Sequence, residues 1–274
     1  MKKITHLSLL ILTVFSVGMF SCGENSDPVV PEPSLDLVED EFVINAAFED
    51  LDYLTLEVLQ SSGLGLRTTA TADLCAGASV NHNQNTKTIV VDFGQGCTSP
   101  NGVLRKGKIT MVYTGNNFLF PGTSISTTFQ GYEVDGIRID GTRTITNAGI
   151  DLVNSRITLR VKIENGKITW PDNSSVTYTS DQTRVVSLSE SGYEASITGT
   201  ASGLSRDGKN YSAAVTDALI VKQSCVDEGI YIPSSGVLSF TYSQITVSVD
   251  YGFGTCDKTV EITYPGGAKM FTID

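Results

Sequence analysis

Histidine is scarce in this chain, which has 274 residues but only two histidines, His6 and His82. His6 directly precedes the N-terminal apolar stretch and belongs to a leader that we expect to be cleaved, so a serine hydrolase would have to use His82 as its base. No G-x-S-x-G elbow accompanies it. A metal centre built on imidazoles would need several histidines in ligand spacing. We therefore expect no catalytic residue and no metal ligand of these kinds.

Basic residues are also in short supply. The chain has 19 lysines and arginines against 30 aspartates and glutamates, which gives a net charge of -11. Such an acidic protein is a poor partner for nucleic acid, because it repels the phosphate backbone. The same charge opposes electrostatic adhesion to anionic lipid headgroups. We therefore expect no nucleic-acid partner.

Phosphate-binding loops are missing in spite of two glycine-bearing strings, DFGQGC at 92–97 and DYGFGTC at 250–256. A loop that cradles phosphate needs a helix start directly after it, to supply converging N–H groups. Turn residues follow both strings instead. We interpret the glycines as tight turns at strand ends, and we expect no cofactor.

Long apolar runs are absent except at the N-terminus. Met1, Lys2 and Lys3 precede an apolar stretch at 7–20, and Ser21 and Cys22 follow it. A transmembrane helix needs roughly 20 apolar residues, so this stretch is too short for a retained anchor. The pattern predicts an export signal peptide over residues 1–21. An ordinary secretory leader cut elsewhere is the alternative, although no A-x-A-like site ends the run.

The string from Gly18 to Cys22 resembles the lipobox of bacterial lipoproteins, in which the cysteine becomes the first mature residue and carries acyl chains such as palmitate. Ser21 fits the small residue before that cysteine, whereas Met19 and Phe20 depart from the usual aliphatic and small residues. The resemblance implies lipidation of Cys22. Several acyl chains would hold the protein to a membrane essentially permanently.

The other four cysteines form an even set, as expected of an oxidising compartment. Three disulfide pairings are possible for Cys75, Cys97, Cys225 and Cys256. We favour Cys75 with Cys97 and Cys225 with Cys256, since each pair closes a local loop. Zinc is the rival interpretation, but the spacings are not C-x-x-C.

Residues 22–34 contain three prolines and no apolar periodicity, and we expect a flexible tether there. Residues 35–62 have helical periodicity and predict one amphipathic helix. Asp36 and Glu39 have the spacing of a capping box. We expect the helix acids to form a solvated outer face. These acids are Glu39, Asp40, Glu41, Glu49, Asp50, Asp52 and Glu57.

Residues 63–274 predict a mainly β fold of short alternating runs divided by turns. We expect a large curved antiparallel sheet or a partly closed barrel, covered by the N-terminal helix. Asn165-Gly166 is the clearest hairpin signal, and Asp135-Gly136, Asp140-Gly141 and Asp207-Gly208 repeat its turn chemistry. The predicted strands cover 86–93, 108–114, 124–134, 137–145, 157–163, 167–170, 176–187, 194–201, 212–223, 236–250 and 259–264.

A weak internal echo suggests that this β domain has two related halves. The string at 92–97 is similar to the string at 250–256, and Ile139-Asp140-Gly141-Thr142 is similar to residues 197–200. Trp170 is the aromatic residue that we would test for ligand binding, since it lies beside the predicted turn Pro171-Asp172-Asn173. Core packing is the more common role of such an aromatic side chain.

The leader, the tether, the cysteine-closed glycine turns and the strings at 105–109 and 139–142 resemble uncharacterised β-rich lipoproteins of Gram-negative envelopes. The resemblance implies a lipid-anchored outer-membrane lipoprotein that faces the periplasm or the cell surface. It supplies no activity. Since no catalytic set accompanies the anchoring signal, we expect a non-enzymatic binding or structural role whose ligand is unknown, with a glycan or a protein as the candidates. The alternatives are a glycan hydrolase with paired carboxylates and a carrier of an apolar ligand.

Overall fold

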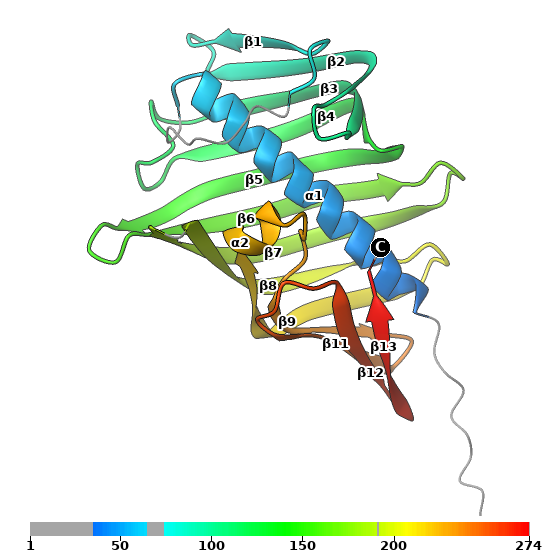
Figure 1. Ribbon diagram of the computed structural model, residues 1–274. Helices are drawn as coiled ribbons and strands as arrows, with labels where there is room; N and C mark the ends of the chain where they lie inside the picture. Colours follow the sequence, from blue (N-terminus) through cyan, green and yellow to red (C-terminus); the bar gives the residue numbers. More distant parts are fainter. Residues whose placement is uncertain (1–34, 65–73, 191, 274) are drawn as a thin grey trace, which may run out of the picture. The chain divides into compact units, whose positions relative to one another are not determined.

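The computed structural model describes residues 35–64, 74–190 and 192–273 (Figure 1). Within these ranges one 13-stranded antiparallel sheet follows the order of the chain, from β1 at one edge to β13 at the other. The sheet is not closed. The long N-terminal helix α1, Asp36–Ser61, lies obliquely across one face of the sheet (Figure 1). The predicted fold class is confirmed.

The strands are β1 Ser79–Asn83, β2 Thr88–Thr98, β3 Leu104–Tyr113, β4 Ser124–Val134, β5 Ile137–Asp151, β6 Arg156–Thr169, β7 Ser175–Ser189, β8 Gly192–Leu204, β9 Asn210–Lys222, β10 Ser235–Tyr242, β11 Ile245–Phe253, β12 Thr259–Tyr264 and β13 Gly267–Thr272. A short helix, α2 at Gln223–Asp227, follows β9. None of the described helices has the length and apolar character needed to cross a membrane.

The core lies between α1 and the sheet. In β7, Val176 and Tyr178 are buried on the helix side, whereas Thr177 and Thr179 point to the opposite, outer face. Alternation of this kind is what a sheet with one buried face requires. Phe48 of α1 stacks on Tyr178 with ring centroids 5.8 Å apart. The helix thus fills the inner face with packed side chains.

The helix also joins distant parts of the sheet. Phe42 contacts Tyr251 of β11 edge-on and stacks on Phe271 of β13. The predicted capping box is wrong in position, because Asp36 is already helical and the N-cap residue is Leu35, which makes no side-chain cap. Burial of one apolar face therefore supports this helix more than capping does.

Two of the predicted turns connect strands, and two do not. Asp135-Gly136 joins β4 to β5, and Asp207-Gly208 lies between β8 and β9. Asp140-Gly141 lies inside β5, and Asn165-Gly166 lies inside β6, so the predicted Asn-Gly hairpin is wrong. Register shifts at both places show the reason: each dipeptide forms a bulge in a continuous strand.

The opposite error occurs in the predicted strand at 236–250, which is two strands. Ser243 and Gln244 both have positive φ, 47° and 66°, and form the turn between β10 and β11. Positive φ at both central residues is the geometry of a tight hairpin turn. The sequence signal was missing because neither residue is a glycine or an asparagine.

Glycine bulges recur across the sheet and let it curve around α1. Register shifts lie at Gly107, Gly131, Gly141, Gly199 and Gly236. Gly107 shows how close the backbones come, since a Cβ placed there would lie 2.0 Å from the carbonyl oxygen of Gly131. A bulge bends its strand and increases the local twist.

Both favoured disulfides are confirmed. Cys75, which precedes β1, is bonded to Cys97 near the end of β2. Cys225 of α2 is bonded to Cys256, which follows β11. Each bridge stabilises the fold by about 3 kcal/mol, chiefly because it restricts the unfolded chain.

Two glycines test the importance of close backbone approach. A Cβ at Gly203 would lie 1.8 Å from the carbonyl oxygen of Thr177, whereas a Cβ at Gly149 would meet nothing within 4 Å. We expect Gly203→Ala to lower the free energy of unfolding by about 3 kcal/mol and Gly149→Ala by less than about 0.5 kcal/mol. Urea denaturation with the disulfides intact measures both. Equal effects would contradict the assignment.

Candidate functional site

Buried ion pairs join α1 to the inner face of the sheet. Arg105 of β3 donates to both carboxylate oxygens of Asp50, through Nε at 3.0 Å and through Nη2. Arg143 of β5 donates to Asp52 at 2.8 Å, and Arg184 of β7 donates to the same carboxylate at 2.9 Å. The two guanidinium groups of Arg105 and Arg143 are almost fully buried. Ion pairs as well as apolar contacts therefore join α1 to the sheet.

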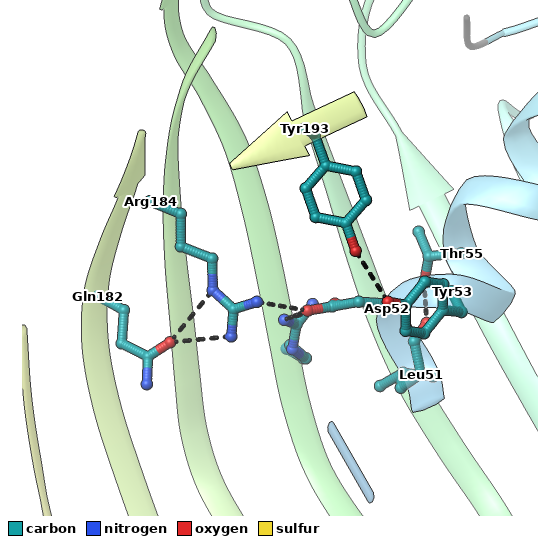
Figure 2. A network of polar contacts seen from close by, with 8 residues as sticks. Leu51, Asp52, Tyr53, Thr55, Gln182, Arg184 and Tyr193 are labelled. Carbon is teal, nitrogen blue, oxygen red and sulfur yellow. Dashed lines mark hydrogen bonds and ion pairs between the residues drawn. The ribbon is translucent and has the colours of Figure 1, made fainter. Parts of the chain in front are cut away.

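Figure 2 shows Asp52 extending from α1 toward the arginines of the sheet. Two nitrogens of Arg184 also contact the amide oxygen of Gln182, which fixes the plane of the guanidinium group. Beside this network the hydroxyl groups of Tyr53 and Tyr193 lie 2.9 Å apart. The contacts come from strands far apart in the sequence, so they set the position of the helix along the sheet.

The expected solvated acidic face is wrong for part of the helix. Asp40 and Glu41 are buried, and Asp50 and Asp52 pair with arginines of the sheet. The helical periodicity could not show this, because the partners lie more than 50 residues away. The strands did contain a signal. Arg143 lies two residues before Ile145 in β5, so the alternation of a strand places both side chains on the same, buried face.

Glu41 is a buried carboxyl group in the core. The hydroxyl of Tyr178 donates to its Oε1 at 3.3 Å, and its Oε2 has no hydrogen-bond partner among the described residues. Burial raises the pKa of Glu41 from 4.5 to about 8, and the negative charge of Asp40 adds to that effect. The side chain is therefore protonated at neutral pH. Burial raises the pKa of Tyr178, Tyr211 and Tyr251, and the nearby Glu41 adds to the effect.

A polar hollow lies at the start of α1. Asp40 pairs with Arg206 at 2.6 Å, and the Arg206 guanidinium lies 3.8 Å above the ring of Trp170. Burial raises the pKa of Asp40 in spite of Arg206. The hollow, of about 360 Å³, is lined by Asp36, Leu37, Glu39, Asp40, Ser205, Arg206, Asp207, Lys209 and Tyr242.

Trp170 lies at the turn between β6 and β7 and is partly buried against the core. Arg206 covers one face of its ring. A ligand could stack only on what that cation leaves open. Trp170, the aromatic residue predicted to bind a ligand, thus lies next to the hollow, but one face of its ring is already in contact with Arg206.

A wider trough of about 570 Å³ lies on the outer face, over strands β6 to β10. Its lining is rich in small hydroxyl side chains, among them Thr179, Thr200, Ser202, Ser212 and Ser239. Lys162, Glu164 and Asp181 add charge, and Lys162 pairs with Asp181 at 3.2 Å. The trough offers hydrogen-bonding groups to a polar ligand.

The other residues considered in the sequence analysis do not come together in one site among the described residues. Cys22 and the residues predicted as signal peptide and tether lie outside the described ranges. His82 of β1 contacts the hydroxyl of Tyr113 through Nε2 at 2.8 Å. Across residues 35–64, 74–190 and 192–273, no three or more His, Cys, Asp or Glu side chains are grouped so that they could hold a metal ion.

No protein-family model, curated protein or solved structure matches this chain. The candidate sites therefore have to be judged from their own geometry.

The buried pair and an exposed pair give a matched test of the helix contacts. Asp52→Asn leaves Arg143 and Arg184 facing a neutral amide, and we expect a loss of about 3 kcal/mol in the free energy of unfolding. Asp140→Asn breaks the exposed pair with Arg138 and should cost less than about 1 kcal/mol. Denaturant unfolding measures both variants. A loss at Asp52 as small as that at Asp140 would contradict the burial of the pair.

Glu41 predicts a pH dependence. Because its pKa is about 8 in the folded protein and 4.5 ordinarily, the unfolded chain releases the proton first. Stability therefore falls as the pH rises from about 4.5 to about 8, by up to about 1.4 kcal/mol per pH unit from this group. Glu41→Gln should remove this contribution and raise stability at pH 8.

Chemical denaturation at a series of pH values measures this slope. Glu39→Gln, at an exposed glutamate of the same helix, is the control and should keep the decline. A slope that Glu41→Gln leaves unchanged would show that Glu41 is not protonated in the folded state.

Proposed function

We propose that this protein is a lipoprotein of the Gram-negative cell envelope, anchored to the outer membrane through acyl chains on Cys22. Its β domain has a non-enzymatic binding or structural role. The observation that carries the proposal is the order of the N-terminal sequence: lysines, one apolar stretch, Ser21, Cys22 and a proline-containing tether. The two disulfides support it, since such bonds persist in oxidising compartments.

A binding role, for a glycan or a protein, agrees with where the accessible polar surface lies. Because α1 covers the inner face, a ligand would meet the outer face of the sheet or the hollow beside Arg206. In the trough of the outer face, hydroxyl groups from β6 to β10 could bind the hydroxyl groups of a sugar chain or the backbone of a peptide.

The two alternative functions have less support. A carrier of apolar ligands would need an open inner face, and the core side chains of α1 pack there. A glycan hydrolase would need one protonated and one free carboxyl group across a cleft. In the hollow at the start of α1, Asp40 is paired with Arg206 and Asp207 with Lys209. These ion pairs favour binding over proton transfer.

Metabolic labelling with palmitate tests the anchor. In a Gram-negative host, the wild-type chain should incorporate label and fractionate with the outer membrane. Cys22→Ser should lose both the label and the membrane association, because acyl chains supply the affinity. Cys225→Ser controls for loss of a cysteine as such and should still be labelled. An unlabelled, freely diffusing wild-type product would overturn the proposal.

A further inference from the structure

Phe253 is fully exposed, which sets it apart from the buried Tyr251 two residues earlier in β11. Moving a fully exposed phenylalanine side chain out of water is favourable by about 2 kcal/mol of transfer free energy. The segment Gly252–Gly254 that presents it is called the Phe253 tip below.

The Phe253 tip is rigidly held. The Gly252 amide donates to Oδ1 of Asp250 at 2.8 Å, and the Gly254 amide donates to the carbonyl of Ser234 at 2.8 Å. Lys222 Nζ donates to the Gly254 carbonyl at 3.1 Å. The disulfide at Cys256 lies two residues further on. The phenyl ring is therefore held out in solvent by the fold and is not part of a loose loop.

A matching segment lies within β2 at 92–97, where the strand is bulged and does not form the tight turn expected from its glycines, and it has no aromatic residue at the corresponding position. The Gly94 amide donates to Oδ1 of Asp92 at 2.9 Å, Gly94 and Gly96 have positive φ, and Cys97 forms a disulfide. Gln95 occupies the position that corresponds to Phe253, and it is exposed. The segment forms with glutamine at this position, so its backbone conformation does not require phenylalanine.

Tyr231 is a second exposed aromatic residue, in the loop that precedes β10. Its side chain is half exposed and contacts Tyr53 of α1 edge-on. The bond between Gly254 and Ser234 brings its loop to the Phe253 tip. Even taken together, the two rings expose only roughly 300 Å² of aromatic surface. A stable protein interface buries about 800 Å² on each partner, so these rings would supply less than half of one. Tyrosine is enriched at the boundary between headgroups and acyl chains, and phenylalanine is among the residues that interfacial segments bury there.

We propose that Phe253 inserts into the interfacial region of a lipid bilayer and gives the anchored protein a second, weak membrane contact that orients its β domain. The inference rests on the proposed anchor, which keeps the tip near the bilayer so that one side chain suffices. The contact is apolar and independent of charge attraction, as the net charge of -11 requires.

The length of the tether allows both contacts at once. Tyr251, next to the Phe253 tip, packs on Phe42, which lies about 10 Å along α1 from Leu35. The 13 residues from Cys22 to Leu35 can span at most about 45 Å. An acyl group on Cys22 and the phenyl ring can therefore enter one membrane surface.

The test compares the two matching segments of β2 and β11. Full-length mature protein is placed in phosphatidylcholine vesicles whose acyl chains are brominated near the headgroup. Phe253→Trp and Gln95→Trp are each made in a Trp170→Phe background, so that the introduced indole is the only one. We expect indole fluorescence at position 253 to be quenched several-fold more than at 95, and to the same extent at low and high salt.

Equal quenching at both positions, or none at 253, would overturn the inference. The indole at position 253 could also become shielded from water in the absence of lipid, to an extent that grows with protein concentration. That result would overturn the inference as well, because it would identify a second copy of the chain as the occupant. If Trp170→Phe prevents folding, both substitutions are made in chains that keep Trp170. The fluorescence of the parent protein is then subtracted from that of each variant. The mass of the N-terminal peptide reports acylation separately. An unmodified Cys22 defeats the proposed function, whereas an unquenched indole at 253 beside an acylated Cys22 defeats only this inference.

Discussion

The ion pairs between α1 and the sheet are the constraint on which the rest of the structure depends. Asp50 and Asp52 reach three arginines on three strands, and two of those arginines are almost completely buried. Buried pairs of this kind add little stability over apolar packing, but they tolerate only one arrangement, since a buried charge without its partner is costly. The helix is consequently fixed in position along the strands, and the inner face of the sheet is closed.

The sheet has to curve, because strands near both of its edges contact the same helix. Phe42 contacts β11 and β13, while Asp50 of the same helix contacts β3. Glycine bulges such as those at Gly107 and Gly141 supply the curvature, because they bend a strand without interrupting the chain. Curvature and ion pairs thus serve the same end, which is to enclose α1.

Much of this fold could be predicted from the sequence, and the errors have physical causes. The helix, most strands and both disulfides follow from local periodicity and cysteine spacing. Asn165-Gly166 misled because positive φ suits a bulge as well as a hairpin turn, and only pairing across strands decides between them. The roles of Asp50 and Asp52 were missed because their arginine partners are distant in sequence. The hollow near Trp170 is formed by distant segments in the same way.

With the inner face closed, the surfaces that a ligand could reach are the hollow at the start of α1, the trough on the outer face and exposed aromatic rings such as that of Phe253. That conclusion holds only if α1 never leaves the sheet on its own. Native-state hydrogen exchange measures this directly. The account predicts that the amides of Leu51 to Val58 exchange only through global unfolding, at the same free energy as those of β7. Exchange of these helix amides through a lower-energy opening, while β7 stays protected, would contradict it.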